Sequence, residues 1–439
     1  MSTVSERVRA TGFPLRYLLV FWLLLLSAVG FLDRTNISIA GIQISRVLHI
    51  DNTHLGLVFS AFLIGYAAFQ IPGGVLARRL GPRRTLFFGV LWWGLFTSLT
   101  ALVPSGISQA LLVMVLVRFA LGAGEAVLYP SINQFVERWV PTDERGKANG
   151  VIFAGVGLGA GVTPPLVTAV ILRYGWRAPF WMSAAIGIAI GSVWYLLARD
   201  LPEEHPRIGE DELALIRKGR DRNNEERHLD NTQRVPWRNL LSSRETLVLT
   251  GSYFAFCYAT WIFFGWFYIY LVQVRRLSLK ASAIDAMFAF ISMTVGSILG
   301  GLAGDWLVRR YSRRMGRCWL TVFSMGLTAA LLVLGSRAAN PQVATLILAI
   351  SVGTLYLSQN CFWALTADIA GPHAGVLSGV MNMGGQIGGA VAASLTPWIA
   401  ARFGWNASFE MAALLAVVGA ISWILVDPDK KLSAMRSAA

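Results

Sequence analysis

Long apolar stretches separated by short polar connections make up most of the chain. A helix needs about 20 mostly apolar residues to cross the hydrocarbon core of a bilayer. Twelve stretches meet this requirement, so the pattern predicts an all-α membrane protein with twelve transmembrane helices. The predicted spans run near residues 17–44, 53–77, 84–103, 108–136, 146–172, 178–198, 245–272, 282–308, 316–336, 342–367, 375–401 and 405–426.

One connection differs from the others because it is long, rich in charge and poor in apolar residues. It covers residues 199–244 and separates six predicted spans from six. The pattern therefore predicts an N-terminal six-helix bundle at 1–198, a cytoplasmic linker loop at 199–244 and a C-terminal six-helix bundle at 245–439.

The two halves repeat short patterns at a nearly constant offset. RYGWRAPF at residues 173–180 matches RFGWNASF at 402–409, and each follows a glycine-rich span that contains a Thr-Pro pair. An internal duplication with an even number of spans per half gives parallel repeats, related by an axis along the membrane normal. We therefore expect two pseudo-symmetric bundles with a binding site between them, near the membrane midplane.

Composition narrows the class of protein. Only 14% of the 439 residues are charged and 55% are hydrophobic, whereas soluble domains carry roughly 25% charged residues. A soluble enzyme and a disordered protein are therefore excluded. The three cysteines are far apart and lie in apolar surroundings, and neither they nor the histidines have the spacing of a metal site or a catalytic constellation. We expect no metal, no cofactor and no enzymatic activity.

The distribution of Lys and Arg residues between the two sides of the predicted membrane accounts for the positive net charge. With the N-terminus inside, 28 of the 38 Lys and Arg residues fall in inside segments and 8 in outside segments. This bias predicts that both termini lie in the cytoplasm, in a bacterial-type inner (plasma) membrane. It also accounts for the net charge of +14 without nucleic-acid binding.

Four ionisable residues lie well inside predicted spans: Asp33, Arg34, Arg118 and Glu125. A charge at the bilayer centre costs at least about 2.5–3.5 kcal/mol, and such residues are functional by default. Their charges sum to zero, and Asp33 and Arg118 lie at the same depth on antiparallel helices. We expect Asp33 to meet Arg118, while Arg34 turns to the cavity or to Glu125.

These residue types suit a proton-coupled anion site. A guanidinium such as that of Arg34 binds a carboxylate through two parallel hydrogen bonds. A carboxylate in a dry environment takes up a proton readily, so protonation of Glu125 or Asp33 would release an arginine for the substrate. The alternative interpretation is a static charge network that fixes helix packing.

The second half has no ionisable residue near the midplane but has polar and aromatic ones. Tyr253, Trp261, Asn360 and Asn382 are its candidate substrate-binding residues, and Tyr66 is a candidate in the first half. Charge in one half and amides and aromatic rings in the other suit an asymmetric substrate with one acidic end and several hydroxyls.

Several segments carry a family resemblance: FLDRTNISIA (31–40), FSAFLIGYAAFQIPGG (59–74) and RFALGAGEAVLYP (118–130). With them the chain resembles the major facilitator superfamily and, within it, the anion:cation symporter family. The resemblance implies alternating access and proton-driven import of an organic anion, most often a sugar acid (hexuronate, hexonate or aldarate). It assigns Arg34 to the substrate carboxylate, Asp33 and Glu125 to protons and Arg118 to their pairing. Tyr66 and Asn382 are assigned to the substrate.

The same resemblance points to gating positions in the loops after the second and eighth spans. Gly74, Arg79 and Gly81 match the superfamily loop pattern, and Asp305 is the acid of the second copy. Arg78 stands where the first copy usually has an acid, and Phe31 stands where sugar-acid members often have a tyrosine.

Other functions stay open. The chain resembles transporters whose relatives also carry phthalate- or tartrate-like carboxylates, and an exchanger or a transporter-like membrane sensor has the same fold. A drug exporter is disfavoured because the expected Gly-Pro-x-x-Gly-Gly pattern is absent from the fifth span. The expected partners are a small organic anion, protons and the lipid bilayer, and we expect a monomer.

Overall fold

The computed structural model describes residues 14–104, 109–141, 144–218, 243–370 and 374–430. Residues 219–242 of the predicted linker and both chain ends lie outside the described residues. Throughout the described ranges the regular structure is helical, without a strand. The predicted all-α class is confirmed.

The first half of the chain forms seven helices in these ranges. The predicted span at 108–136 is divided between two of them, α4 and α5, which meet at Ala126 and Val127. The helices are α1 (Leu15–Leu48), α2 (Asn52–Leu80), α3 (Pro82–Leu102), α4 (Ala110–Glu125), α5 (Leu128–Trp139), α6 (Arg145–Tyr174) and α7 (Ala178–Leu197).

The second half repeats this organisation, with two predicted spans divided in the same way. The span at 245–272 is interrupted at Trp266 and the span at 342–367 at Leu357 and Ser358. The elements are α10 (Arg244–Gly265), α11 (Phe267–Gln273), α12 (Leu279–Arg310), the π-helical turn η3 (Arg314–Trp319), α13 (Leu320–Arg337), α14 (Pro341–Tyr356), α15 (Gln359–Ala370), α16 (Ala374–Phe403) and α17 (Trp405–Ile424).

Eleven helices of the described chain are long and apolar enough to cross a membrane. They coincide with eleven of the predicted spans. The remaining span, 375–401, coincides with α16, which has 30 residues but is rich in glycine and carries Asn382 and Gln386. These residues lower the hydropathy of α16, so the count of twelve spans stays a prediction.

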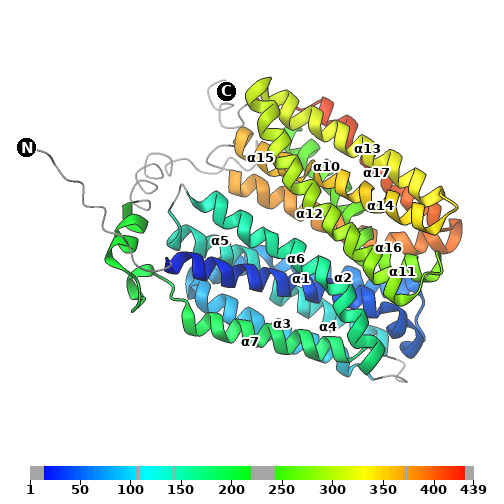
Figure 1. Ribbon diagram of the computed structural model, residues 1–439, viewed down its shortest axis with the longest axis horizontal. Helices are drawn as coiled ribbons and strands as arrows, with labels where there is room; N and C mark the ends of the chain where they lie inside the picture. The colour runs from blue at the N-terminus through cyan, green and yellow to red at the C-terminus, as the bar shows by residue number, and fades with distance from the viewer. Residues whose placement is uncertain (1–13, 105–108, 142–143, 219–242, 371–373, 431–439) are drawn as a thin grey trace, which may run out of the picture.

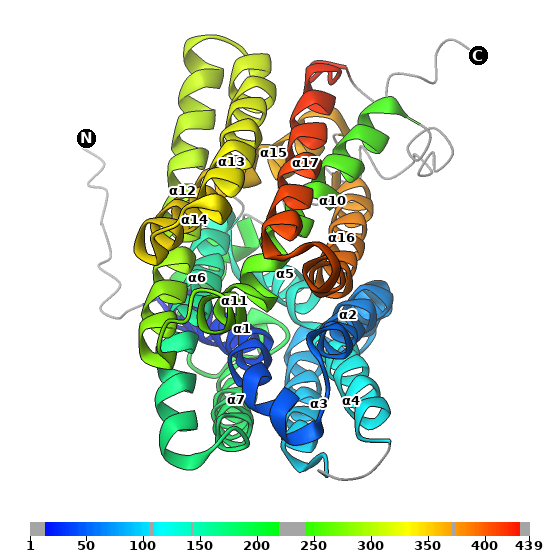
Figure 2. The ribbon, with the colours of Figure 1, turned by 90° about the vertical axis from the view of Figure 1, so that its right-hand side faces the viewer.

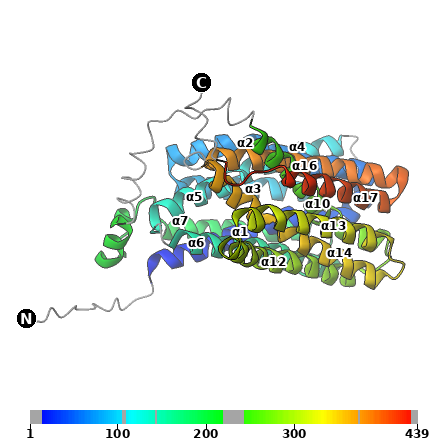
Figure 3. The same cartoon turned by 90° about the horizontal axis from the view of Figure 1, so that it is seen from above.

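The helices form two bundles that run along the long axis of the molecule (Figure 1). Helices α1–α7 lie in one bundle and α10–α17 in the other, and α2 packs against α16 and α6 against α12 where the bundles meet (Figure 2). We call the end that carries the start of α1 and residues 199–218 the linker end, and the other the far end. The helical part of residues 199–218 projects beyond the bundle at the linker end (Figure 3).

Hydrogen bonds join the two bundles between the midplane and the far end. The Asn52 amide donates to Gln273 Oε1 at 2.9 Å, and the Thr168 and Tyr268 hydroxyls lie 3.1 Å apart. Ser60 Oγ donates to the carbonyl of Ala390 at 2.6 Å. The far end is therefore the closed side of the bundle interface in this conformation.

The sequence repeat is reproduced in the backbone. Gly175 has φ +81° and Gly404 has φ +84°, and each stands at the same position of its repeat, in the turn between two helices. Glycine adopts positive φ without the steric cost that a Cβ imposes. The two matching motifs therefore fold as equivalent turns, as expected for an internal duplication.

Each bundle has a helix crossing that only glycine permits. A Cβ on Gly65 of α2 would collide with the Phe119 carbonyl of α4, and a Cβ on Gly122 of α4 would collide with the Phe62 carbonyl of α2. In the second bundle, Gly296 of α12 meets the backbone of Gly353 of α14 in the same way. Small residues let membrane helices approach closely, and here they set the position of α4 against α2.

We expect Gly122→Ala to destabilise the protein by about 1–3 kcal/mol, because the added methyl group meets backbone that cannot move aside. The matched control is Gly161→Ala in α6, where nothing lies within 4 Å of the place that a methyl group would take. The control should be neutral or stabilising, since alanine is the better helix former. Thermal unfolding of the purified variants in detergent measures the change in stability of each variant. Equal melting temperatures would contradict the role of this crossing.

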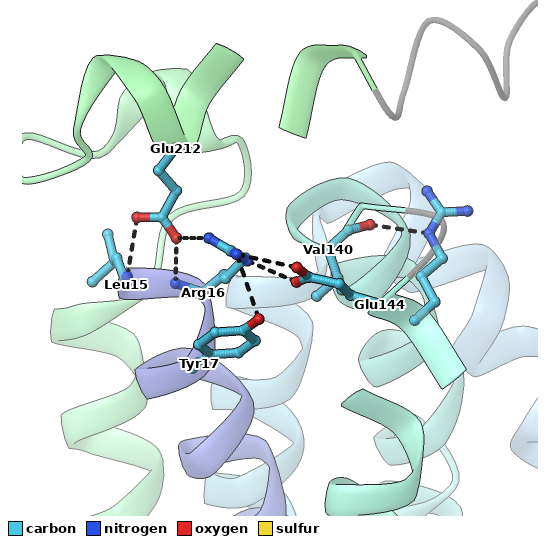
Figure 4. Close-up of polar contacts among 7 residues, drawn as sticks. Leu15, Arg16, Tyr17, Val140, Glu144 and Glu212 are labelled. Atoms are coloured by element: carbon cyan, nitrogen blue, oxygen red, sulfur yellow. Dashed lines mark hydrogen bonds and ion pairs between the residues drawn. The ribbon is translucent and has the colours of Figure 1, made fainter. Parts of the chain in front are cut away.

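At the linker end, Arg16 joins three parts of the first bundle (Figure 4). Its guanidinium binds Glu144, before α6, at 2.9 Å and Glu212, in the helical part of the linker, at 3.0 Å. Glu212 also accepts hydrogen bonds from the backbone N–H groups of Leu15 and Arg16, which have no partner within the helix because they lie in the first turn of α1. The described part of the linker is thereby fastened to the first bundle.

We expect this Arg16 contact to weaken in acid. The hydrogen bond from Arg16 holds the pKa of Glu144 below its ordinary value of 4.5. A depressed pKa in the folded state contributes stability above the ordinary pKa, and that stability is lost as the pH falls through the folded value. The hydrogen-exchange protection of the first turn of α1 and of residues 210–218, corrected for the intrinsic exchange rate at each pH, should fall below about pH 4.5. Glu144→Gln should remove part of this pH dependence, whereas Glu410→Gln at the far end should not. An identical profile in both variants would contradict it.

Candidate functional site

The four predicted intramembrane charges come together in the first bundle. Asp33 and Arg34 are neighbours on α1, and Arg118 and Glu125 lie seven residues apart on one face of α4. All four are buried, with exposed fractions of 2%, 7%, 2% and 0% in the order of the chain. The structure therefore confirms that these side chains share one environment inside the helix bundle.

Arg34 and Glu125 form a buried ion pair. Arg34 Nε donates to Glu125 Oε2 at 2.6 Å. The remaining atoms are not satisfied, because Arg34 Nη2 and Glu125 Oε1 are buried without a hydrogen-bond partner. Of the two orientations that the sequence left open for Arg34, the structure has the one toward Glu125.

The expected contact between Asp33 and Arg118 is not formed. Neighbours on a helix point about 100° apart, and since Arg34 takes the direction of α4, Asp33 is turned toward Ser183 of α7. Both carboxylate oxygens of Asp33 are buried without a hydrogen-bond partner. Across the described residues, Arg118 donates no hydrogen bond and makes no ion pair, and its Nε is buried.

Aromatic rings take the place of counter-ions around the two arginines. The Arg34 guanidinium carbon lies 4.8 Å from the Phe31 ring centroid and 4.5 Å from that of Tyr66. Phe62 is shared, because the guanidinium carbons of Arg34 and Arg118 lie 5.7 Å and 5.0 Å from its centroid. Cations are attracted to ring faces, most strongly where water is excluded.

A small pocket of about 10 Å³ lies where both arginines meet the second bundle. This volume holds about one water molecule, so the site is almost closed. Two of the lining residues, Arg34 and Trp261, were predicted to bind the substrate, and Arg118 was predicted to pair with the proton-carrying carboxylates. The lining is Arg34, Ile37, Ser38, Phe59, Phe62, Arg118, Trp261, Phe264, Gly265 and Ala393.

The other predicted substrate residues do not line this pocket. The Asn382 amide donates to Gln70 Oε1 at 3.0 Å, which joins the two bundles between the pocket and the linker end. The Asn360 amide donates to the Ser297 carbonyl at 2.6 Å. Tyr253 is buried among the rings of Phe256, Phe362 and Trp363 in the second bundle. Their roles in binding stay predictions.

The sequence did not single out Phe62, Phe264 or Gln70. Phe62 lies four residues before Tyr66, so it shares the face of α2 that Tyr66 presents, and this spacing was the available signal. Nothing comparable marks Phe264 and Gln70, since each reaches the site only through the way the two bundles meet.

The gating positions lie at the linker end of each bundle. Asp305 pairs with Arg317 at 3.3 Å, and Arg317 also binds Asp368 at 3.2 Å. In the first bundle, Arg78 occupies the position that corresponds to Asp305, so this loop has no acidic residue there. The Gly74 carbonyl accepts a hydrogen bond from Gln134, and Gly81 turns with φ +85° against Asp200.

A cavity of about 640 Å³ opens at this end beside Arg78 and Arg79 and is separate from the charge cluster. Its polar lining includes Arg138, Asp200 and Glu204. Whether the gating residues control access stays a prediction.

Comparison with known proteins decides the family. The sequence profile of the Major Facilitator Superfamily matches residues 23–393 and 311–437. This chain belongs to the Major Facilitator Superfamily. The fold agrees, because a bacterial homolog of the human lysosomal transporter Spinster, in an inward-facing and unoccupied conformation, superposes with a TM-score of 0.78 at 16% identity. That superposition covers 94% of this chain and 97% of the other.

The curated relatives of this superfamily member are anion transporters. The chain is 30% identical to the probable sulfoacetate transporter SauU of Cupriavidus necator, over 96% of this chain and 98% of that protein. It is 28% identical to the probable galactarate/D-glucarate transporter GarP of Escherichia coli, over 98% of each. The protein is therefore a multi-pass membrane transporter and not an enzyme, as the sequence analysis expected.

The Arg34–Glu125 pair should show the energetics of a buried ion pair. We expect Arg34→Met or Glu125→Leu alone to cost about 3–5 kcal/mol, because each leaves an uncompensated buried charge, and the double variant to be close to neutral. The control is the exposed pair Arg337–Glu410, at 2.7 Å, where each single change should cost no more than about 1 kcal/mol. Unfolding of the purified variants in detergent measures the cycle. Additive losses at Arg34 and Glu125 would show that the pair is not coupled.

Proposed function

We propose that this protein imports an organic anion by proton symport with alternating access. The observation that carries the proposal is the ion pair between Arg34 and Glu125, with 2.6 Å between Nε and Oε2 and no exposure of Glu125. A proton on Glu125 replaces the charge that neutralises the guanidinium, so Arg34 then needs a new anion. Binding of the proton and binding of the substrate are thereby linked in one exchange of partners.

Asp33 supplies a second carboxyl for a proton, and the proton is the only coupling ion proposed, with no cofactor. Asp33 is buried and makes no ion pair among the described residues, and the polar group that it faces is Ser183, so it can exchange a proton without breaking an ion pair. Alternating access is supported by the interface itself. Among the described residues, direct hydrogen bonds join the bundles toward the far end, and the amide pair of Gln70 with Asn382 joins them closer to the linker end.

Two substrate classes are candidates. A sugar acid is supported by the resemblance and by the relative named for galactarate and glucarate. A shorter carboxylate or sulfonate is supported by the relative named for sulfoacetate and by the pocket, whose lining is mostly aromatic and aliphatic. An inner-membrane location with both termini in the cytoplasm follows from the charge bias of the loops. A monomer suffices because one chain supplies every group of the site.

Transport into liposomes tests the proposal. The full-length protein is reconstituted, and uptake of labelled glucarate, glucuronate, sulfoacetate and succinate is followed with and without an inward proton gradient. We expect at least one anion to accumulate only with the gradient, and an uncoupler to abolish the accumulation. Equal uptake with and without the gradient, for every anion transported, would overturn proton symport.

We expect Glu125→Gln to abolish accumulation driven by the gradient but to keep exchange of labelled for unlabelled substrate. The amide resembles the protonated carboxyl, so Arg34 is free in the variant but no proton is released. Arg34→Ala should lose both accumulation and exchange, because it removes the guanidinium that releases Glu125 and then binds the substrate anion. Glu410→Gln, at an exposed pair, is the matched control and should transport normally. Normal accumulation by Glu125→Gln would remove Glu125 from the coupling.

A further inference from the structure

Arg118 is a buried cation that has no counter-ion within ion-pair distance among the described residues, although Glu125 and Asp33 lie near enough to attract it. It is 2% exposed and lines the pocket, and in the described chain it makes no hydrogen bond and no ion pair. Burying a charge without a hydrogen-bonded partner is costly, and the nearest aromatic face, that of Phe62, compensates only part of this cost. A guanidinium that lines a pocket and has no ion-pair partner can bind an anion through charge-assisted hydrogen bonds.

We infer that the pocket binds a compact dianion, with one anionic group on Arg118 and the other on Arg34 once Glu125 is protonated. The inference rests on the proposed function and narrows its substrate class. It also changes the role of Arg118, which the family resemblance treated as a partner for carboxylates of the protein itself.

The spacing of the two cations limits the substrate to a short one. Both guanidinium carbons lie over the Phe62 ring, at 5.7 Å and 5.0 Å from its centroid, so their separation cannot exceed the sum of these distances. A bidentate contact places a carboxylate carbon roughly 4 Å from each guanidinium carbon. When both anionic groups lie between the two guanidinium carbons, about 3 Å or less remains between those groups. Because α1 and α4 belong to the same bundle, this limit does not change when the bundles move relative to each other.

The rest of the pocket suits a body with few hydroxyls. Its neutral lining is Ile37, Ser38, Phe59, Phe62, Trp261, Phe264, Gly265 and Ala393. The Ser38 hydroxyl already donates to the Thr35 carbonyl, so Trp261 carries the other neutral side-chain donor among these lining residues. A sugar acid would leave most of its hydroxyls without partners, and each unpaired polar group costs affinity.

Charge balance is consistent with two anionic groups. With Asp33 and Glu125 ionised, the four-residue cluster is neutral. When both carboxyls are protonated it carries two positive charges, which a dianion neutralises and a monoanion does not. The expected stoichiometry is therefore two protons for each dianion, and transport should not move net charge.

The test is a ligand panel in which anionic charge and hydroxyl content vary independently. Binding to the purified full-length protein is measured by calorimetry at pH 5.5, with transport measured in parallel in liposomes. The probes are sulfoacetate and succinate, propionate and methanesulfonate, and the hydroxylated glucarate and glucuronate. We expect the compact dianions to bind roughly 10- to 100-fold more tightly than the compact monoanions, the loss associated with one charge-assisted contact. They should also bind about tenfold or more tightly than glucarate.

Variants assign this preference to Arg118. Arg118→Gln should reduce binding of the dianions to the level of the monoanions and leave monoanion binding, through Arg34, nearly unchanged. Arg118→Lys, which keeps the charge, should restore part of the preference and serves if the glutamine variant does not fold. Arg402→Gln, an exposed arginine that stacks on Trp398, is the matched control. It should bind every probe as the parent does.

The outcomes separate this inference from the proposed function. Binding of glucarate or glucuronate as tight as that of the compact dianions overturns it, as does equal binding of mono- and dianions, an unchanged preference in Arg118→Gln, or no binding of either dianion. Any of these results is compatible with proton-driven uptake of another anion. Conversely, tight binding of dianions without uptake driven by a proton gradient supports the pocket assignment and overturns proton symport.

Discussion

The buried contact between Arg34 and Glu125 constrains much of the first bundle. Inside a protein the attraction between opposite charges is strong, but either charge alone is expensive to keep from water. Helices α1 and α4 must therefore hold these side chains at contact distance. The close crossing of α2 and α4 at Gly65 and Gly122 fixes where α4 can lie, and Phe62, beside that crossing, presents its ring to both arginines. Backbone packing and the placement of charge are thus parts of one arrangement.

Much of the fold could be predicted from sequence because a bilayer leaves few solutions for the backbone. Every backbone polar group in hydrocarbon must be bonded within its own segment, so long apolar runs become helices. The duplicated Gly175 and Gly404 turns were visible as repeated letters. The breaks near Trp266 and Leu357 were not visible, because no proline marks them, whereas Pro130 follows the break near Ala126 and was a signal that the sequence analysis did not use.

The sequence predicted the four charged residues of the site but not most of the neutral residues that line the pocket. Spacing along α1 and α4 was enough to bring four ionisable residues together. It could not decide which of two neighbouring side chains, Asp33 or Arg34, turns toward α4, because that depends on the rotation of α1 within the bundle. Phe264 and Ala393 join the pocket from the second bundle, and Asn382 is held by Gln70 from the first. Contacts between segments hundreds of residues apart leave no periodic trace in either segment.

The two halves of the chain contribute different kinds of residues to the charge cluster and the pocket. All four charges come from α1 and α4, whereas α10 and α16 contribute Trp261, Phe264, Gly265 and Ala393. In the proposed function, the groups that exchange protons therefore lie in the first half of the duplication, and part of the lining that contacts the substrate lies in the second. A consequence of this separation is that replacing a few rings in the second half can change which substrate fits while the four charges of the first half stay in place.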